Sequence, residues 1–341
     1  MKSVILVGGV GTRMRPLTYE TPKQMLPLVG VPMIECVFDA LARHGITDAV
    51  LALGYLPDRF IEAYPSGVIA GVHVTYAVEP EPLDTAGAIR FAAKLANIDE
   101  TFIVVNGDII SDLDISKLVK FHRDHRAEAT IALHAVEDPS RFGVVPTTPD
   151  GRVIAFVEKP PRDEVPTNLI NAGTYVFEPS VLERIAPTGR VSIERDTFPE
   201  LAAAGTLYAM ADDSYWLDAG TPQAFLQANV DFMLGHFREN AVAGTADGSW
   251  IHPSSTVDPS ATIINSVVDR NCVVKANVVL ENSVLLPGAV VEEDVEVRFS
   301  IIGPDAVIGA LSRLDATCVV GANVRVEPGS RLAGDVRLGG V

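Results

Sequence analysis

The sequence predicts an α/β protein in which a doubly wound sheet is followed by a β-helix. Two patterns carry this prediction: short apolar runs alternate with helical stretches up to residue 235, and aliphatic residues recur every six positions after Trp250. Strands that alternate with helices are typical of a mainly parallel sheet with helices on both faces. A period of six fits neither a helix nor a plain strand, and it indicates stacked hexapeptide turns. We therefore expect domains at residues 1–235 and 251–341, joined by a linker at 236–250.

The N-terminal region shows the expected alternation in its first hundred residues. Apolar runs predict strands at 4–7, 49–53, 72–78 and 102–105, and apolar residues at helical spacing predict helices at 34–41, 57–61 and 86–95. In such a sheet, ligands bind beyond the carboxyl ends of the strands. Gly8–Gly9 and Asp108 both follow predicted strands, so this edge of the sheet is the first candidate for a site.

The C-terminal region carries the six-residue repeat. One series is Ile302, Ile308, Leu314, Val320, Val326 and Leu332; Ile251, Val257 and Ile263 start the same period, and Val267, Val273 and Val279 resume it after a slip. We expect each of these residues to point into the coil, with small or turn-forming residues at the corners. Ordinary β-hairpins are the alternative, but six consecutive matches favour the coil.

Composition narrows the possible functions. Hydrophobic residues make up 48% of the chain and the net charge is −17, which indicates a folded protein that is poorly suited to nucleic acid or to an acidic membrane surface. No apolar run approaches the roughly 20 residues that a membrane span needs. The three cysteines are far apart and lack a zinc-binding spacing, which predicts reduced thiols in a cytoplasmic protein. We expect His122, His125 and Asp124 to form a solvated helix face and not a metal site.

A glycine-rich stretch from Gly8 to Thr18 follows the first predicted strand. Glycines let backbone N–H groups approach phosphate oxygens. This is not a Walker loop, and Met14 stands where a dinucleotide-binding loop needs its third glycine. The glycines alone are as consistent with a structural turn. However, Arg13, Arg15 and Lys23 place three cations beside the loop of an otherwise acidic chain, which favours an anion site.

This stretch, continued by Pro22-Lys23-Gln24-Met25-Leu26-Pro27, resembles the opening signature of the sugar-phosphate nucleotidyltransferases, which carry proline at the position of Gln24. Further blocks match in order along nearly the whole chain: Glu79 through Gly87, Asn106-Gly107-Asp108, Phe156 through Pro160, Asn171-Ala172-Gly173 and Trp216 through Pro222. A hexapeptide coil after such a domain resembles the guanylyltransferases and the long thymidylyltransferases in particular. The resemblance implies a Rossmann-like mixed sheet, a left-handed parallel β-helix, and nucleotidyl transfer to a sugar 1-phosphate.

The resemblance also implies roles for individual residues. Asp108 and Asp218 would bind Mg²⁺, which prefers oxygen ligands, although each aspartate alone would more often be a turn former or a helix cap. Arg13 and Lys23 would hold the triphosphate, and Lys159 would place the sugar phosphate. The other expected nucleotide-binding residues are Leu6, Gly8, Gly9, Gly11, Thr12, Glu79, Thr85 and Gly87. The sugar phosphate would lie against Gly143, Glu158, Lys159 and Asn171; without the resemblance, Glu158 and Lys159 would be read as a solvated surface pair.

Glu79 is the residue from which we predict the base. A carboxylate only accepts hydrogen bonds, and it matches the adjacent N1–H and N2 donors of guanine. Relatives that use thymidine or uridine triphosphate commonly carry glutamine here. Glutamate therefore favours GTP, and the resemblance to the guanylyltransferases implies mannose 1-phosphate as the second substrate and GDP-mannose as the product. Glu81 is a competing candidate, and Asp84 stands where the family carries glycine, a position that aspartate tolerates even if φ is positive.

Two alternatives stay open. Another base or sugar, as in a glucose-1-phosphate thymidylyltransferase, would use the same residues. A nucleotide-sugar-binding regulatory subunit would lack turnover, but it could have lost any of the charged residues that this chain keeps. Acyltransferases built on such coils usually need a histidine within the coil, and the only histidine in this half is His252 at its start. We expect the coil to be an assembly or regulatory module of a homo-oligomer.

Overall fold

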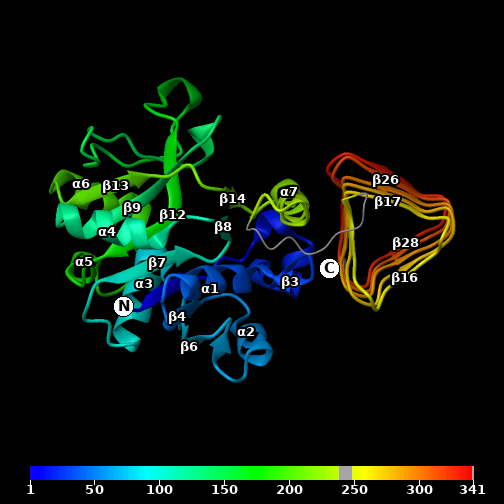
Figure 1. Ribbon diagram of the computed structural model, residues 1–341, viewed down its shortest axis with the longest axis horizontal. Helices are drawn as coiled ribbons and strands as arrows, with labels where there is room; N and C mark the ends of the chain where they lie inside the picture. The colour runs from blue at the N-terminus through cyan, green and yellow to red at the C-terminus, as the bar shows by residue number, and fades with distance from the viewer. Residues whose placement is uncertain (238–247, 340–341) are drawn as a thin grey trace. The chain divides into compact units, whose positions relative to one another are not determined.

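The computed structural model describes residues 1–237 and 248–339, so most of the predicted linker lies outside the described residues. The chain divides into two compact units, Met1–Gly9 with Ile34–Trp216, and Val10–Met33 with Leu217–Val341. The first unit holds a large sheet, and the second holds the coil (Figure 1). The segment Val10–Met33, which we call the signature segment, thus belongs to the same compact unit as the coil.

A ten-stranded mixed sheet forms the first unit. Four of its strands are parallel and lie in the order β7 (Phe102–Asn106), β1 (Ser3–Leu6), β4 (Asp48–Leu53) and β6 (Val72–Val78). β12 (Leu169–Phe177) pairs antiparallel with β7 and with β9 (Ala129–Ala135). The remaining strands of this sheet are β5 (Val68–Ile69), β10 (Gly143–Val144), β11 (Val157–Glu158) and β13 (Leu207–Ala211).

Helices cover both faces of this sheet. They are α1 (Met33–Arg43), α2 (Pro57–Ala63), α3 (Asp84–Leu95), α4 (Ile115–His125), α5 (Val181–Arg184) and α6 (Phe198–Ala203). Alternate strand residues such as Val4, Val50 and Val104 share one core with Ile89 of α3 and Phe198 of α6. α4 contacts β9, β12 and β13, but its buried residues lie outside that core, so it packs on the other face. The doubly wound sheet predicted from the alternation of strands and helices is confirmed, and its antiparallel strands make it the mixed sheet that the resemblance implies.

The second unit contains, besides the coil, short elements of the signature segment and one long helix. They are β2 (Pro27–Leu28), β3 (Val31–Pro32) and α7 (Pro222–Leu234). α7 packs on β2, and the side chain of Asn229 accepts a hydrogen bond from the Val29 N–H at 2.9 Å. Two further short strands, β8 (Ile109–Ser111) and β14 (Trp216–Asp218), follow β7 and precede α7.

Three stacked sheets of short parallel strands form the coil (Figure 1). The first sheet runs from β15 (Trp250–Ile251) to β30 (Arg337–Leu338), the second from β16 (Thr256–Val257) to β28 (Arg325–Val326), and the third from β17 (Thr262–Ile264) to β29 (Arg331–Ala333). The strands between them are β18 (Val267–Val268), β19 (Val273–Val274), β20 (Val279–Glu281), β21 (Val284–Leu285), β22 (Val290–Val291), β23 (Glu296–Arg298), β24 (Ile301–Ile302), β25 (Val307–Ile308), β26 (Arg313–Asp315) and β27 (Val319–Val320). These are the stacked turns expected from the hexapeptide period, and they form the left-handed β-helix that the resemblance implies.

Aliphatic side chains fill the interior of the coil, but one predicted series is wrong by one residue. The interior core contains Ile302, Ile308, Leu314, Val320 and Val326, as predicted. In place of the expected Val267, Val273 and Val279, it contains Val268, Val274 and Leu280. These three pair in register with Ile251, Val257 and Ile263 of the preceding turn. Both residues of each strand are aliphatic, so the period alone could not tell the inner from the outer one.

Polar residues at fixed positions stabilise the turns of the coil. Asparagine and aspartate take positive φ at its corners, namely at Asn265, Asn271, Asn277, Asn282, Asp294, Asp305 and Asn323, a conformation that these residues tolerate better than most. Buried serines form a ladder, since the Ser283 N–H donates to Ser266 Oγ at 3.1 Å and the Ser300 N–H donates to Ser283 Oγ at 3.2 Å. Each serine thus satisfies a backbone donor of the next turn.

His122 does not lie on a solvated helix face, so that prediction is wrong. Its side chain is only 1% exposed, with Nδ1 2.9 Å from Thr130 Oγ1 and Nε2 3.0 Å from Glu178 Oε1. Burial lowers the pKa of His122 and outweighs the opposing effect of Glu178. The residue is therefore a core histidine of α4 with both ring nitrogens paired.

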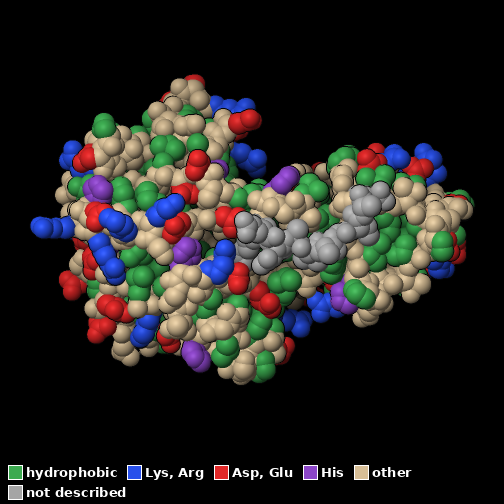
Figure 2. All heavy atoms as spheres, in the orientation of Figure 1, with side chains coloured by type: hydrophobic (Ala, Val, Ile, Leu, Met, Phe, Trp, Pro, Cys, Tyr) green, Lys and Arg blue, Asp and Glu red, His purple; other side chains and the backbone are tan. Residues whose placement is uncertain are grey.

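The described surface is mixed in charge. On the face shown in Figure 2, acidic and basic side chains are interspersed. The three cysteines are buried and unpaired with one another. Each helix in the described ranges is too short or too polar to cross a membrane.

Candidate active site

Glu79 lies beside the glycine turn that follows β1. A Cβ atom at Gly8 would lie 3.0 Å from Glu79 Oε1, so the glycine lets the carboxylate approach the turn. The other oxygen, Oε2, accepts a hydrogen bond from the Leu83 N–H at 3.0 Å. Burial raises the pKa of the Glu79 carboxyl against the effect of that hydrogen bond. Glu81 is exposed, so of the two candidates for reading the base, Glu79 is the one that is half-buried and oriented.

Helix α3 begins at Asp84, directly after the Leu83 N–H that binds Glu79. Asp84 has a φ of 62°, which explains why glycine suits this position and why aspartate can replace it. The Thr85 hydroxyl donates to Glu194 Oε2 and accepts from the Ile193 N–H, both at 2.8 Å. This hydroxyl therefore anchors α3 to another segment of the unit. Gly87, the next predicted contact, is buried in the same helix.

Asp108 follows β7 in a tight turn. The Gly107 N–H donates to the Leu6 carbonyl at 2.9 Å, and a Cβ atom at Gly107 would lie 2.6 Å from Val7 Cγ1. Only glycine fits in this position between β1 and β7. The turn places the half-buried Asp108 at the carboxyl edge of the parallel strands, as predicted. Leu6, at the end of β1, is half-buried beside it, whereas Gly8 and Gly9 are exposed.

The predicted sugar-phosphate residues gather around β10 and β11. Gly143 pairs with Glu158, and a Cβ atom at Gly143 would lie 2.4 Å from the Phe156 ring and 3.0 Å from Glu158 Oε2. Lys159 Nζ lies 2.8 Å from Glu158 Oε1, and the Lys159 side chain is 64% exposed. Lys159 also has a φ of 47°, which is uncommon for a residue other than glycine. The lysine is thus largely exposed, as in a surface pair, whereas its partner Glu158 is half-buried next to Gly143.

Asn171 is held by a residue that the sequence did not single out. Its Nδ2 donates to the Tyr175 hydroxyl at 2.9 Å, and its Oδ1 accepts from the Gly173 N–H at 2.9 Å. Tyr175 is fully buried in the main core of the sheet. The amide is therefore fixed in orientation from both ends. A tyrosine four residues after Asn171 is the signal that could have predicted this.

In the second unit, Arg13 faces Asp218. The guanidinium Nη2 lies 3.5 Å from Asp218 Oδ2, and the side chains are 54% and 20% exposed. Asp218 Oδ1 accepts a hydrogen bond from the Gly220 N–H at 2.9 Å. A Cβ atom at Gly220 would lie 2.6 Å from Arg13 Nη2, so the guanidinium packs directly on this glycine. A cation and a carboxylate from two of the predicted blocks are brought together here.

The loop around Arg13 is closed by its own residues. Gly11 has a φ of 67°, and its carbonyl accepts hydrogen bonds from the Thr18 hydroxyl at 2.8 Å and from the Met14 N–H at 2.9 Å. Thr12 is exposed on this turn, and Lys23 packs against Gly11. Arg15 points elsewhere, since its guanidinium lies 5.1 Å from the centre of the Tyr19 ring. Arg13 thus meets Asp218, an aspartate of another predicted block.

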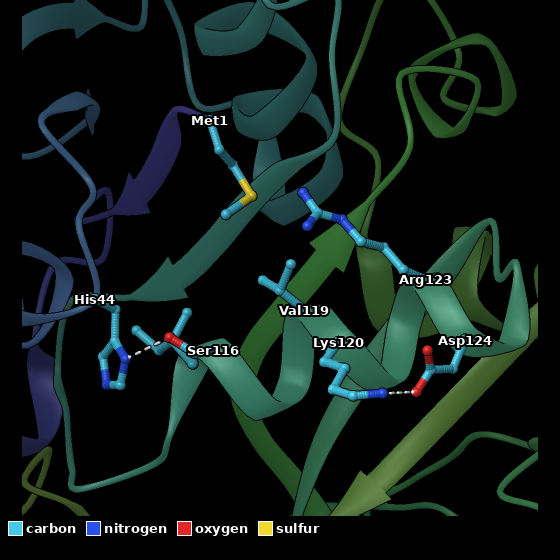
Figure 3. A pocket seen from close by; sticks show the side chains of 8 residues that line it. Met1, His44, Ser116, Val119, Lys120, Arg123 and Asp124 are labelled. Carbon is cyan, nitrogen blue, oxygen red and sulfur yellow. Dashed lines mark hydrogen bonds and ion pairs between the residues drawn. The ribbon is translucent and has the colours of Figure 1, made fainter.

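A separate pocket lies on the sheet unit (Figure 3). It has a volume of about 410 Å³, and its lining residues are Met1, His44, Ile115, Ser116, Val119, Lys120, Arg123 and Asp124. Polar groups in it pair with one another, since His44 Nδ1 lies 3.0 Å from Ser116 Oγ and Lys120 pairs with Asp124. The residues predicted for the active site are not among those that line it.

Known proteins match this chain over both of its parts. The family described as Nucleotidyl transferase matches residues 2–233, and the family described as GMPPB C-terminal domain matches residues 246–338. The mannose-1-phosphate guanylyltransferase of Mycobacterium tuberculosis is 41% identical over 258 residues, which cover 75% of this chain and 71% of that protein. The mannose-1-phosphate guanyltransferase of Hypocrea jecorina is 38% identical over 343 residues, which cover 96% and 92%. Among solved structures, HddC from Yersinia pseudotuberculosis matches with a TM-score of 0.59 and 31% identity, over 68% of this chain and 99% of that one.

Proposed function

This chain belongs to the nucleotidyl transferase family, and we propose from that premise that it transfers GMP from GTP to mannose 1-phosphate. The products are GDP-mannose and pyrophosphate. The observation that carries the proposal is the match to a mannose-1-phosphate guanyltransferase over 96% of this chain, which includes the coil as well as the sheet. The chain is thus an enzyme of the sugar-1-phosphate nucleotidyltransferase class, and the choice of GTP and mannose is the specific part of the proposal.

The reaction needs no general base. The sugar phosphate is an anion at neutral pH, and one of its oxygens attacks the α-phosphorus of GTP in line. The new P–O bond forms as the bond from the α-phosphorus to the β-phosphate oxygen breaks, and pyrophosphate leaves with the electron pair. The protein must hold two anions together and neutralise the charge of the transferring group.

Three cations supply that neutralisation. Arg13 and Lys23, close to Gly11 in the signature segment, would bind the triphosphate and the leaving pyrophosphate, and arginine can grip phosphate with two N–H groups. Lys159 would bind the sugar phosphate. Its partner Glu158 would then accept hydrogen bonds from sugar hydroxyls, so its pairing at 2.8 Å keeps the lysine oriented in the absence of substrate. Asn171 and the Gly143 backbone would complete the sugar site.

Asp108 and Asp218 each have the chemistry of a magnesium ligand. Both offer carboxylate oxygens, and Asp218 is oriented by the Gly220 N–H. Mg²⁺ binds through one or two carboxylates and fills its other positions with phosphate and water oxygens. The described residues contain no group of three ligating side chains, and this mode of binding does not require one. We propose that these two aspartates would hold Mg²⁺, which when bound would neutralise phosphate charge.

Glu79 would read the guanine base. Its Oε1 lies next to Gly8, and its Oε2 keeps a second lone pair beyond the bond from Leu83. Both oxygens can therefore accept from the N1–H and N2 donors of guanine. A glutamine in this place could keep its oxygen on the Leu83 N–H and would then turn an NH₂ donor toward the base. This geometry is a physical reason for glutamate to favour guanine.

We further propose that the enzyme acts in the cytoplasm as a homo-oligomer, with subunit contacts through the coil. Light scattering on the full chain gives its mass in solution directly. A mass equal to that of a single chain would contradict the oligomer.

Pyrophosphate release by the purified full chain tests the function. GTP, dTTP, UTP, ATP and CTP are each combined with mannose 1-phosphate and with glucose 1-phosphate, with Mg²⁺ and with EDTA. The proposal predicts the highest rate for GTP with mannose 1-phosphate and no turnover in EDTA. Faster turnover of dTTP with glucose 1-phosphate would replace it with the thymidylyltransferase alternative, and no turnover of any pair would favour a regulatory subunit.

A further inference from the structure

One face of the coil is covered by the chain itself. On the four inner strands of the first sheet, the residues that point away from the interior core are apolar and at most 2% exposed, namely Val267, Val284, Ile301 and Val319. The corresponding outward positions of the second sheet are half-buried or exposed, and they run from Thr256 to Arg325. Apolar side chains on the outside of a coil are buried only if other residues pack over them. The contacts of this sheet therefore show what covers it.

The last turn of the coil holds the start of the signature segment. The Arg337 guanidinium donates from Nη1 to the Arg13 carbonyl at 2.6 Å and to the Arg15 carbonyl at 2.9 Å. Its Nε is fixed by Asp335 Oδ1 at 2.8 Å, and its side chain is 30% exposed. Pro16 packs against the same turn, because a Cβ atom at Gly339 would lie only 2.5 Å from it.

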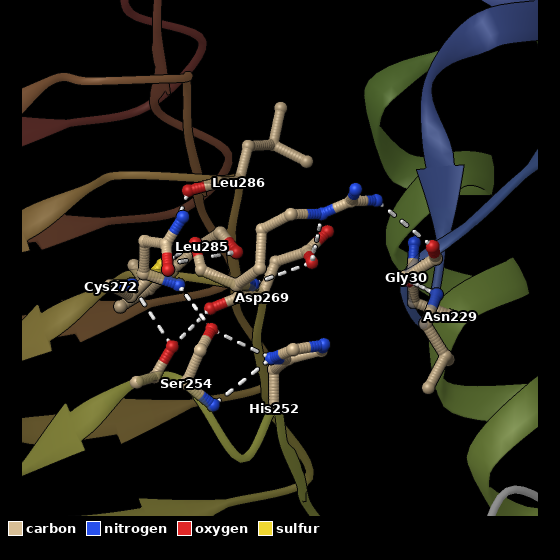
Figure 4. A network of polar contacts seen from close by, with 12 residues as sticks. Gly30, Asn229, His252, Ser254, Asp269, Cys272, Leu285 and Leu286 are labelled. Carbon is tan, nitrogen blue, oxygen red and sulfur yellow. Dashed lines mark hydrogen bonds and ion pairs between the residues drawn. The ribbon is translucent and has the colours of Figure 1, made fainter.

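The first turns of the coil hold the other end of the segment. Arg270 Nη2 donates to the Gly30 carbonyl at 3.3 Å, and a Cβ atom at Gly30 would lie 2.6 Å from the Trp250 ring. Figure 4 shows Gly30 and Asn229 opposite the coil residues Asp269 and His252. The signature segment is thus bound near both of its ends, by Trp250 of β15 and Arg270 after β18 at one end and by Arg337 of β30 at the other.

One of these contacts fixes the backbone of Arg13, the residue that we expect to bind the triphosphate. The carbonyl that Arg337 holds belongs to Arg13, and the side chain of the same residue faces Asp218 and packs on Gly220. The turn from Gly11 to Arg15 begins with a glycine at a φ of 67°, which adds conformational freedom. Fixing its backbone therefore fixes the position from which the Arg13 guanidinium extends.

We propose that the first sheet of the coil is a brace for the signature segment and that Arg337 is a positioning residue for Arg13. The coil then contributes to the transfer reaction itself, and not only to assembly. This inference rests on the proposed function of Arg13 in binding the triphosphate. A charged group stabilises a transition state most when it is already held in position before the reaction. Even a small displacement of such a group can lower the rate many-fold.

Kinetics of Arg337→Gln test the brace. We expect kcat/KM for the nucleoside triphosphate to fall by about 10- to 100-fold, the range that displacement of a positioned group produces. The KM for the sugar 1-phosphate should stay unchanged, because Lys159 lies in the other unit. Arg337→Lys should restore part of the loss, since an ammonium can still donate to a carbonyl. Arg331→Gln is the matched control, because Arg331 bonds the Leu311 and Ser330 carbonyls within the coil, and it should keep native rates.

A double-mutant cycle with Arg13→Ala separates positioning from folding. If Arg337 acts through Arg13, then Arg337→Gln costs much less in an Arg13→Ala background than in the native one. Full additivity of the two losses would overturn the proposal, as would native kinetics of Arg337→Gln. The midpoint of thermal unfolding is measured for each variant, and the proposal also fails if the loss of rate follows the loss of folded protein.

The brace and the proposed substrates can fail separately. All variants are compared on whichever nucleotide and sugar phosphate the native chain turns over fastest. A different preferred pair would change the proposed function and leave the brace intact. If the native chain turned over GTP with mannose 1-phosphate and Arg337→Gln kept native kinetics, the proposed function would stand and the brace would be wrong.

Discussion

The predicted site residues on the sheet and those on the signature segment are held in different ways. On the sheet, Glu79 is oriented by an N–H four residues away, and Asp108 by a glycine turn at the end of its own strand. On the signature segment, Arg13 meets Asp218, which lies 205 residues later, and its carbonyl is bonded by Arg337, 324 residues later. The first group should therefore respond only to local changes, and the second should respond to changes in the coil.

The largest effect is expected from the two aspartates, one of each group. Asp108→Asn and Asp218→Asn should each nearly abolish turnover at saturating Mg²⁺, because a neutral amide is a poor ligand for this ion. Asp218→Asn also removes the partner of Arg13, so its KM for GTP should change as well. The measurement is pyrophosphate release across a magnesium titration. Asp163→Asn, on an exposed turn, is the control, and near-native rates in both test variants would show that the metal assignment is wrong.

The next effect separates the two groups by substrate. Arg13→Ala should reduce the rate by on the order of 10²–10³-fold, the usual loss when one preorganised charge-stabilising group is removed. Lys159→Ala should mainly raise the KM for mannose 1-phosphate, since it would bind the acceptor. Full kinetics in both substrates check this. If Lys159→Ala left that KM unchanged, Lys159 would not belong to the acceptor site.

A smaller change is expected in base selectivity. Glu79→Gln should weaken the preference for GTP over dTTP or UTP by roughly 1–3 kcal/mol, the value of one good bidentate base contact. Glu81→Gln is the control and should change little, because Glu81 is exposed. The ratio of kcat/KM values for the competing nucleotides measures this. Loss of selectivity in the Glu81 variant alone would mean that the other carboxylate reads the base.

The serine ladder should contribute to the stability of the coil. Ser283→Ala leaves the buried Ser300 N–H without its acceptor, which costs about 1–3 kcal/mol in the free energy of unfolding. Thr262→Ala, at an exposed outward position of the third sheet, should have little effect. Denaturant unfolding of the full chain measures both. Equal stability of the two variants would remove the ladder as a stabilising feature.

The smallest effect concerns pH. The pKa of His122 is lowered by burial, so the unfolded chain binds a proton more tightly than the folded one. Its contribution to stability is complete above the ordinary histidine pKa of about 6.5 and is lost as pH falls through that value toward the lowered pKa. His122→Gln should therefore flatten the loss of stability as pH falls below about 6.5. An unchanged slope in the variant would show that other groups control it.

Periodicity predicted most of the fold, because each short run of residues reports on its own surroundings. The alternation of strands and helices and the six-residue spacing identified the sheet and the coil. The inner series that begins at Val268 was missed by one position, since neighbouring residues of those strands are both aliphatic. The serine ladder was also missed, although serine recurs every 17 residues at 249, 266, 283 and 300.

The partners of the site residues were less predictable. The motifs indicated Arg13 and Asp218 as charged residues of a site, but no pattern linked Arg337 to the signature segment. That link depends on how the coil packs against residues more than 300 positions away. His122 shows the same limit, because its helix pattern did not reveal that Thr130 and Glu178 lie within hydrogen-bonding distance.

A competition assay tests the central claim most directly. The native chain is given GTP and dTTP at equal concentration, together with mannose 1-phosphate and glucose 1-phosphate, and the sugar nucleotides formed are identified by mass and retention. The account predicts GDP-mannose as the main product and its loss in the Asp108→Asn variant. Formation of dTDP-glucose as the main product would contradict it.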